Sequence, residues 1–382
     1  PAGSTRYDFL DWLRVIAIFV LLFFHTGMLF VGWGWHIENA EVIESLRLPM
    51  DIAHRLRMPL LFVIAGASLW FALARHSGFA VLRERSMRLL LPLVVGMFLI
   101  VPPQIWYERL FRHQWEGGYL QFWLEKVLQF QPYPQGNFSW HHLWFILYLY
   151  VYVVALLPLL VWWRRGNFAV RSGPWLYLAF LPLAVNEALL KPLFPETHAL
   201  VGDWYVFNHY LLFTVYGFAL ASSAANWDWF ALWRHASLGI GLTLFAVAKV
   251  LFATGVIHPD TVADAFIANA FTWCWLMVFL GYGRHYLSFS NGLLRWARDA
   301  SYPVYILHQT LIIAIGFYVI QQPWTPWAKY FVVLIATMVG CAVLYQFVVR
   351  PFRITRVLFG MKRNRAAQRT PAGRLATSDD VC

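Results

Sequence analysis

Two ionisable residues, Arg14 and His25, lie inside the first long apolar run of the sequence. Ionisable side chains within hydrocarbon are costly, and function is their default explanation. The two residues are eleven positions apart, about three helical turns, so a helix carries both on nearly the same face, roughly 16 Å apart along its axis. That face would present a fixed cation at one end and a titratable imidazole at the other.

Both residues also have a structural interpretation. A buried histidine can simply hydrogen-bond two helices together, and an arginine can extend to a lipid phosphate at the membrane boundary. Two costly residues on one face favour a lined cavity instead, with His25 as the candidate catalytic group.

A second group of cations precedes Pro92. Arg85 and Arg88 are three positions apart and are neighbours on one helical face, whereas Arg83 points elsewhere in a regular helix. Guanidinium groups bind phosphate through paired hydrogen bonds, so Arg85 and Arg88, with Arg83 in reserve, are candidate phosphate ligands. Anchoring at the positively charged side of a membrane explains the same residues equally well.

Aromatic and polar residues gather in two predicted loops, 32–55 and 106–142. Tryptophan rings can stack on sugars, although an aromatic belt at the membrane interface explains most single tryptophans. The run Trp35-His36-Ile37-Glu38-Asn39 makes the first loop the better candidate for binding a carbohydrate.

Two further motifs lie at or within apolar runs. The first is His141-His142-Leu143-Trp144-Phe145, and the second contains Tyr302, Tyr305 and His308 at spacings that share one helical face. The embedded polar residues also include a candidate ion pair, Glu187 with Lys249.

The elements that carry these residues are predicted to be membrane helices. Hydrophobic residues make up 60% of the 382 positions and charged residues 13%, against roughly 45–50% and about 25% in soluble proteins. This composition excludes a soluble globule, a disordered chain and a secreted disulfide scaffold. The predicted fold class is all-α, a polytopic membrane bundle of about ten transmembrane helices. Ten apolar runs are long enough to span a bilayer: 9–31, 56–74, 87–105, 143–163, 174–192, 207–223, 236–255, 265–283, 302–320 and 328–349.

Residues 1–349 are predicted to form one transmembrane domain, and residues 350–382 a flexible basic tail in the cytoplasm. The first run is interpreted as a retained helix, because no small-residue cleavage pattern of a signal peptide follows it. No internal repeat is evident, which disfavours a transporter built from inverted repeats.

The distribution of basic residues predicts the orientation. With the N-terminus in the cytoplasm, 20 Lys and Arg fall on the inner side and 8 on the outer side, so both termini are predicted to be cytoplasmic. The net charge of +11 is concentrated in the tail, which favours contact with anionic membrane lipids over nucleic acid. The three cysteines have no metal-binding spacing, and no metal, nucleotide or nicotinamide motif is present.

Together these motifs resemble the integral-membrane acyltransferase-3 family. The resemblance follows the order of the chain and covers nearly all of it. It rests on Leu10-Asp11-Trp12-Leu13-Arg14 followed by His25, on Pro59-Leu60-Leu61-Phe62-Val63-Ile64-Ala65-Gly66, on the arginine-rich segment that ends at Pro92, on His142-Leu143-Trp144-Phe145, and on Ser301-Tyr302-Pro303-Val304-Tyr305-Ile306-Leu307-His308.

The resemblance implies a multi-pass enzyme of the bacterial inner membrane. It would move an acetyl or succinyl group from cytoplasmic acyl-coenzyme A to a hydroxyl of a periplasmic or extracellular glycan. Its expected partners are acyl-coenzyme A, the carbohydrate acceptor and membrane lipids, with no permanently bound cofactor, no metal and no nucleic acid. The expected site comprises His25 for catalysis, Arg14, Arg85 and Arg88 for the acyl donor, Trp35, His36, Glu38, His142 and Trp144 for the acceptor, and Tyr305 and His308 as further candidates.

A sugar hydroxyl is a poor nucleophile, so the transfer needs a base whose pKa lies near neutrality. His25 could be this base or could carry the acyl group itself, and the sequence leaves both routes open. The alternative function is a proton-coupled transporter of glycans or lipid-linked sugars, with His25 as a proton relay.

Overall fold

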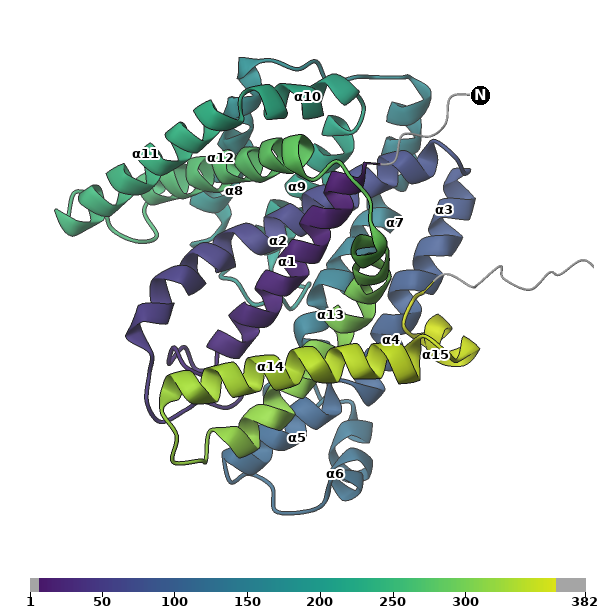
Figure 1. The fold of residues 1–382 in the computed structure, drawn as a ribbon, viewed down its shortest axis with the longest axis vertical. Coiled ribbons are helices and arrows are strands. Elements are labelled where there is room, and N and C mark those ends of the chain that lie inside the picture. Colours follow the sequence, from purple (N-terminus) through teal and green to yellow (C-terminus); the bar gives the residue numbers. More distant parts are fainter. Residues whose placement is uncertain (1–6, 362–382) are drawn as a thin grey trace, which may run out of the picture.

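The computed structural model describes residues 7–361, and the regular secondary structure of that part is helical. It contains one isolated bridge, between Pro132 and Phe138. The prediction of an all-α fold is therefore confirmed. The α-helices, labelled in part in Figure 1, are α1 (Asp8–Gly27), α2 (Glu44–Leu73), α3 (Gly78–Arg85), α4 (Leu91–Leu99), α5 (Pro102–Phe111), α6 (Tyr119–Lys126), α7 (Trp144–Arg165), α8 (Phe180–Leu190), α9 (Trp204–Leu220), α10 (Ala224–Leu232), α11 (Arg234–Ala253), α12 (Val262–Tyr286), α13 (Gly292–Val319), α14 (Pro326–Leu344) and α15 (Arg353–Leu358).

Within the described residues, eight helical segments are long and apolar enough to cross a membrane. They are Asp8–Gly27, Glu44–Leu73, Gly78–Phe111, His141–Arg165, Arg234–Ala253, Val262–Tyr286, Gly292–Val319 and Pro326–Val349. The other two predicted spans, 174–192 and 207–223, correspond to the shorter apolar segment Pro174–Leu190 and to the 17-residue α9.

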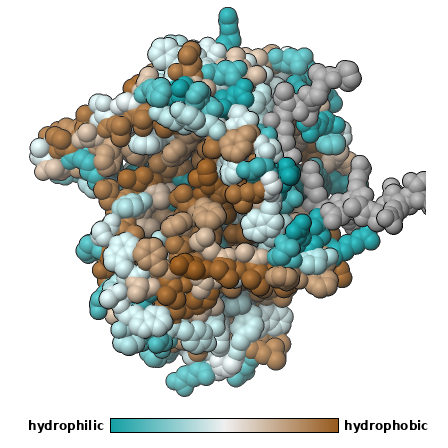
Figure 2. Space-filling model, in the orientation of Figure 1, coloured by the Kyte–Doolittle hydropathy of each residue, from teal (hydrophilic) through white to brown (hydrophobic). Residues whose placement is uncertain are grey.

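Large apolar side chains on the outside of the bundle identify its lipid-facing surface. Figure 2 shows hydrophobic residues along the length of α14. There, Ile335 and Val339 are 58% and 56% exposed. An exposed apolar surface of this extent is unstable in water and stable against lipid chains. The chain is a multi-pass membrane protein.

Helix α2 is longer than the apolar run that predicted it. It begins at Glu44, so half of the predicted loop 32–55 is helical. Leu46 and Met50 lie four positions apart and pack in a small apolar cluster with Phe24 and Val31. This contact stabilises the extra turns, which the mixed polar and apolar sequence did not indicate.

Two glycines let α2 and α9 pack with their backbones in contact. A methyl group built at Gly66 would overlap the carbonyl oxygen of Thr214, and one built at Gly217 would overlap that of Val63. Small residues at such crossings are a common way to pack helices tightly in membranes. The contact holds the half of the bundle formed by α8 to α12 against α1 and α2.

The arginine-rich segment contains a break in helical geometry. A π-helical turn, Ser86–Leu90, joins α3 to α4. Pro92 has no N–H, so the carbonyl of Arg88 lacks its usual helical partner, and the wider turn accommodates this loss. Turns of this type are frequent at functional sites; of the two arginines predicted to bind phosphate, Arg85 directly precedes this turn and Arg88 lies within it.

Part of the predicted basic tail packs on the bundle. Residues 353–358 form α15, and the Nε of Arg88 donates to the carbonyl of Gly360 at 3.1 Å. Residues 362–382, most of the predicted flexible segment, lie outside the described residues.

Candidate functional site

A pair of histidines from α1 and α13 is central to the candidate site. The Nδ1 of His25 lies 2.7 Å from the Nε2 of His308, and the two rings are nearly parallel, with their centres 4.9 Å apart. His308 is fully buried. The fold therefore brings together two residues that the sequence singled out independently.

The hydrogen bonds determine where the protons of this pair lie. The Nδ1 of His308 is 2.6 Å from the carbonyl oxygen of Tyr305, which can only accept, so this nitrogen carries a proton. In a neutral ring the Nε2 of His308 is then the acceptor, and the Nδ1 of His25 must donate to it. The lone pair of His25 is left on Nε2, which has no hydrogen-bond partner among residues 7–361.

Aromatic rings and a buried cation surround His25. The ring of Trp35 stacks 6.0 Å from it, and the ring of Phe24 meets its edge at 5.5 Å. The guanidinium of Arg57 lies over the face of Phe24, 3.5 Å from the centre of the ring. Arg57 is 8% exposed, has no acidic partner within salt-bridge distance among the described residues, and its buried Nε makes no hydrogen bond.

A second polar network lies next to this pair. Glu108 on α5, 1% exposed, accepts a hydrogen bond from the Nδ1 of His36 at 2.5 Å and another from the hydroxyl of Tyr133 at 3.1 Å. Burial, and then the neighbouring carboxylate, raise the pKa of Tyr133 to about 12, so the phenol stays protonated and donates. The amide of Gln309 donates to the Nε2 of His36 at 3.3 Å.

The network continues through Gln104 to His142. Gln309 donates to the side-chain oxygen of Gln104 at 3.0 Å, and the Nε2 of His142 donates to the carbonyl of Ile306 at 2.9 Å. The Nδ1 of His142 therefore accepts from Gln104 at 3.4 Å. We call His25, His308, His36 and His142 the histidine region; each of these rings has a tautomer set by its partners.

His36, Glu108 and His141 hold donor atoms within 4.8 Å of one another, a spacing that suits a metal ion. Two features oppose this use. The rings of His36 and His141 are stacked, with 24° between their planes, so their in-plane lone pairs converge poorly. Arg112 and Arg109 also lie 3.6 and 3.9 Å from Glu108, and their charges repel a divalent cation. The arrangement fits a hydrogen-bonded His–Glu pair better than a metal site.

The remaining predicted acceptor residues have varied positions. Glu38 accepts hydrogen bonds from the backbone of Gly34 and Trp35, at 2.6 and 3.2 Å, and so braces its own loop. Trp144 packs 4.1 Å from the ring of His198 and 5.2 Å from that of Tyr210, on the side of α9. Tyr305 donates to the backbone carbonyl of His142, which ties α13 to the start of α7.

The predicted donor arginines lie at the opposite end of α1. Arg14 donates to Asp11 at 3.1 Å and to the hydroxyl of Ser68 at 3.3 Å. Arg88 pairs with Glu84 at 3.1 Å. The charges of Arg14 and Arg88 both act on the guanidinium of Arg85, so the three cations share one region.

This arginine region, which we define as Arg14, Arg85, Arg88 and Tyr302, has unused hydrogen-bonding capacity. The Nε of Arg85 and the hydroxyl of Tyr302 are both buried without a hydrogen-bond partner among the described residues. Arg83, the reserve candidate, is exposed instead. Like charges held together with donors unsatisfied form a site suited to an anion such as phosphate.

Sequence reasoning missed Glu108, Gln104, Gln309 and Arg57. A signal was available for two of them, because Gln104 and Glu108 are four positions apart and share one face of α5. Gln309 follows His308 directly, but its side chain carries no charge that would mark it in the sequence. Arg57 lies in the predicted span 56–74 and is buried inside α2.

Comparison with known proteins agrees with this architecture. The model of an acyltransferase domain family, acyltransferase-3, matches residues 7–346. The chain belongs to this family. It is thus a membrane acyltransferase, as the sequence motifs had indicated.

Curated relatives span most of the chain at low identity. Glucans biosynthesis protein C of Salmonella heidelberg is 22% identical over 356 residues, covering 83% of this chain and 85% of the relative. The protein of the same name from Escherichia coli O6:K15:H31 is 23% identical over 368 residues, covering 91% and 92%. No solved structure matches the chain.

Proposed function

We propose that this acyltransferase moves an acyl group, acetyl or succinyl, from acyl-coenzyme A to a hydroxyl of a glycan on the other side of the membrane. One observation carries the proposal: His25 is held by His308 with the lone pair on its unpartnered Nε2, on the helix that carries Arg14. The names of the relatives, which refer to glucans, support a carbohydrate acceptor.

In the proposed reaction, the acceptor oxygen attacks the carbonyl carbon of the thioester while the Nε2 of His25 takes the hydroxyl proton. The carbon–sulfur bond then breaks, and the departing thiolate takes the proton from the imidazolium. Neutral His25, coenzyme A and the acylated glycan remain. His308 keeps His25 in the reactive tautomer, and the positive charge of Arg57 favours the negative oxygen of the intermediate.

The arginine region binds the phosphates of the donor. Arg85 and Tyr302 have donors that the described chain leaves unsatisfied. A phosphate would accept hydrogen bonds from them, and its negative charge would offset the repulsion among Arg14, Arg85 and Arg88. No permanently bound cofactor or metal is needed for the steps above.

Transfer by the purified protein tests this function directly. Radiolabelled acetyl- or succinyl-coenzyme A is incubated with the protein and a neutral glucan, and released thiol and labelled glucan are measured together. Equal amounts of both products are expected. A proton-coupled transporter, the alternative function, would release no thiol, and that result would refute the proposal.

The proposed location is the inner membrane of a bacterium, with both termini in the cytoplasm, anionic lipids near the basic residues, and the arginine region facing the acyl-coenzyme A pool. The excess of Lys and Arg on one side supports this orientation. Cysteine labelling in a background without native cysteines tests it. A cysteine at Gln121 should react with an impermeant reagent from outside and one at Arg75 should not; the reverse pattern would refute the orientation.

A further inference from the structure

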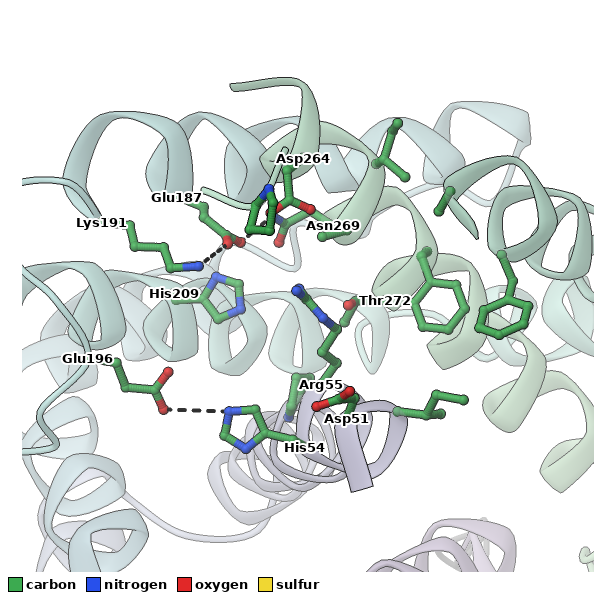
Figure 3. A pocket seen from close by; sticks show the side chains of 18 of the residues that line it. Asp51, His54, Arg55, Glu187, Lys191, Glu196, His209, Asp264, Asn269 and Thr272 are labelled. Atoms are coloured by element: carbon green, nitrogen blue, oxygen red, sulfur yellow. Dashed lines mark hydrogen bonds and ion pairs between the residues drawn. The ribbon is translucent and has the colours of Figure 1, made fainter. Parts of the chain in front are cut away.

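A polar cavity of about 530 Å³ lies apart from the histidine region, among α2, α8, α9, α11 and α12. Figure 3 shows its side chains converging from these helices and from the loop that carries Glu196. Its volume falls in the usual range for small-molecule sites, about 300–1,000 Å³. None of the residues predicted to bind substrate lines it.

The side chains of His54 and Phe24 separate this cavity from His25. His54, which lines the cavity, stacks 5.8 Å from the ring of Phe24, and Phe24 meets the ring of His25. A molecule in the cavity would therefore lie on the α2 side of the Phe24 ring, with the rings of His54 and Phe24 between it and His25.

The cavity wall combines apolar side chains with charged ones whose signs nearly balance. Four carboxylates and three Lys or Arg cations line it. Glu187 accepts from Lys191 at 3.1 Å and from Asn269 at 2.7 Å, so its partner is Lys191 and not the Lys249 considered from the sequence. On the other side Glu196 pairs with His198 at 3.1 Å.

These pairs keep their charges although they are partly enclosed. Burial acts to raise the pKa of Glu196, but the hydrogen bond and charge of His198 outweigh it and hold that pKa well below its usual range. Burial acts to lower the pKa of Lys191, and the contacts with Asp260 and Glu187 raise it instead. A wall of alternating donors and acceptors with little net charge suits hydroxyl groups, which both donate and accept.

The cavity also has polar groups without partners. The Nδ1 of His209 is buried and makes no hydrogen bond among the described residues. Figure 3 shows this ring between the Glu187–Lys191 pair and the Glu196–His54 pair, with Arg55 reaching toward the same space. Arg55 has no hydrogen bond or ion pair within residues 7–361, and the ammonium of Lys249 faces only the ring of Phe245, at 5.6 Å. Buried polar groups in native proteins normally have partners, so the Nδ1 of His209 indicates a polar ligand, and the exposed cations Arg55 and Lys249 could reach the same ligand.

Aromatic side chains complete the lining. Tyr205, Tyr210 and Phe245 border the same space, and aromatic faces pack well on the C–H surface of a sugar ring. An anionic lipid head group would satisfy Arg55 and Lys249 but would face four carboxylates. The chemistry of the wall favours an uncharged polyol.

We propose that this cavity binds the carbohydrate acceptor, an uncharged saccharide, and presents it to the His25 side of the bundle. The proposal rests on the proposed function and relocates the acceptor, from the tryptophan-rich loops expected from the sequence to the cavity between α2 and α11.

Filling the cavity tests the proposal without altering its charges. Ala248 on α11 lines the cavity, whereas Ala246 on the same helix is exposed and does not. Binding of laminaritriose, a neutral glucose trimer, is measured in detergent by saturation-transfer NMR without any acyl donor. Ala248→Phe should weaken binding at least tenfold, and Ala246→Phe should change it less than twofold. Melting temperatures show whether each variant is folded.

A second pair of variants probes the polar groups. Arg55→Gln should weaken trisaccharide binding several-fold, while Arg47→Gln, two turns earlier on α2 and outside the cavity, should not. Three results would overturn the proposal: no binding of laminaritriose to the wild type, equal binding to Ala248→Phe and Ala246→Phe, or displacement of the trisaccharide by phosphatidylglycerol. The binding test contains no acyl donor and is therefore independent of the transfer assay. A wild type that binds the trisaccharide but releases no coenzyme A in the transfer assay would refute the proposed function and leave the saccharide site standing.

Discussion

The histidine region and the arginine region lie toward opposite ends of α1 and differ in how their polar groups are satisfied. Around His25, hydrogen bonds connect the rings and set their tautomers: His25 donates to His308, Gln309 donates to His36, and His36 donates to Glu108. Around Arg85, three cations share a region and two donors remain without partners. The hydrogen bonds between the rings keep the lone pair of His25 on Nε2, whereas the buried donors of Arg85 and Tyr302 still lack acceptors that a ligand could supply. The comparison indicates chemistry at one end and anion binding at the other.

The largest effect is expected at His25. His25→Gln keeps the size and polarity of the side chain but removes its basicity, so acyl transfer should fall by about 10²–10⁴-fold, the usual contribution of a general base. The wild-type rate should also fall as the pH is lowered, because a protonated imidazole cannot accept a proton. Rates are measured from thiol release at saturating donor.

Donor affinity serves as the control for this variant, since His25→Gln leaves the arginine region intact. Near-normal transfer at matched expression would contradict a catalytic role for His25. An acyl adduct found on His25 after rapid quenching would replace the general-base route with a covalent one.

The next largest effect is expected at His308, which orients His25. His308→Phe removes the acceptor for the Nδ1 proton of His25 and should lower kcat about 10²-fold, the order of loss from a misplaced catalytic group. His308→Gln can still accept that hydrogen bond through its side-chain oxygen and should recover much of the rate. If His308 only fills space, the reverse is expected: His308→Phe should keep most of kcat, and His308→Gln should have no higher kcat than His308→Phe. The readout is kcat together with its pH profile in both variants.

A smaller effect is expected in the arginine region. Arg85→Gln should weaken coenzyme A binding by about 1.5–3 kcal/mol, the scale of hydrogen bonds to charged groups, with kcat at saturating donor little changed. Arg85→Lys should restore only part of the affinity, because a point charge cannot reproduce the paired donors. Isothermal titration measures the affinity.

Arg83→Gln provides the matched control, since Arg83 is two positions away and exposed. If Arg83→Gln and Arg85→Gln weaken coenzyme A binding equally, the arginines act as general membrane anchors and the contrast between the two regions disappears.

Several features of the site could be predicted because they depend on short stretches of sequence. Arg14 and His25 share a helix face, and Arg85 and Arg88 sit beside a proline that disturbs its helix, since helical period and proline geometry are local properties. The individual histidines at 142 and 308 were also identified because polar residues at or within apolar runs are conspicuous, and His36 was identified from its aromatic and polar neighbours in the first loop. Their roles in catalysis or binding remain predictions.

The contacts among these residues could not be predicted in the same way. Glu108 falls in a predicted loop, and the fold buries it against His36, while Arg57 is a cation within a predicted span whose burial against Phe24 depends on how α1 and α2 pack. The cavity needs five helices and a loop to exist at all. Such features depend on which helix faces meet, and the sequence of any one helix does not specify its neighbours.

The sequence by itself determined that this chain is a bundle of membrane helices with a cation and an imidazole along one face of its first helix. Apolar runs and helical spacing establish both through interactions within a few turns. Only the tertiary structure decided that His25 pairs with His308, 283 positions away, and so carries its lone pair on Nε2. That pairing depends on how α1 and α13 pack, and packing is set by the shapes of helix surfaces drawn from the whole chain.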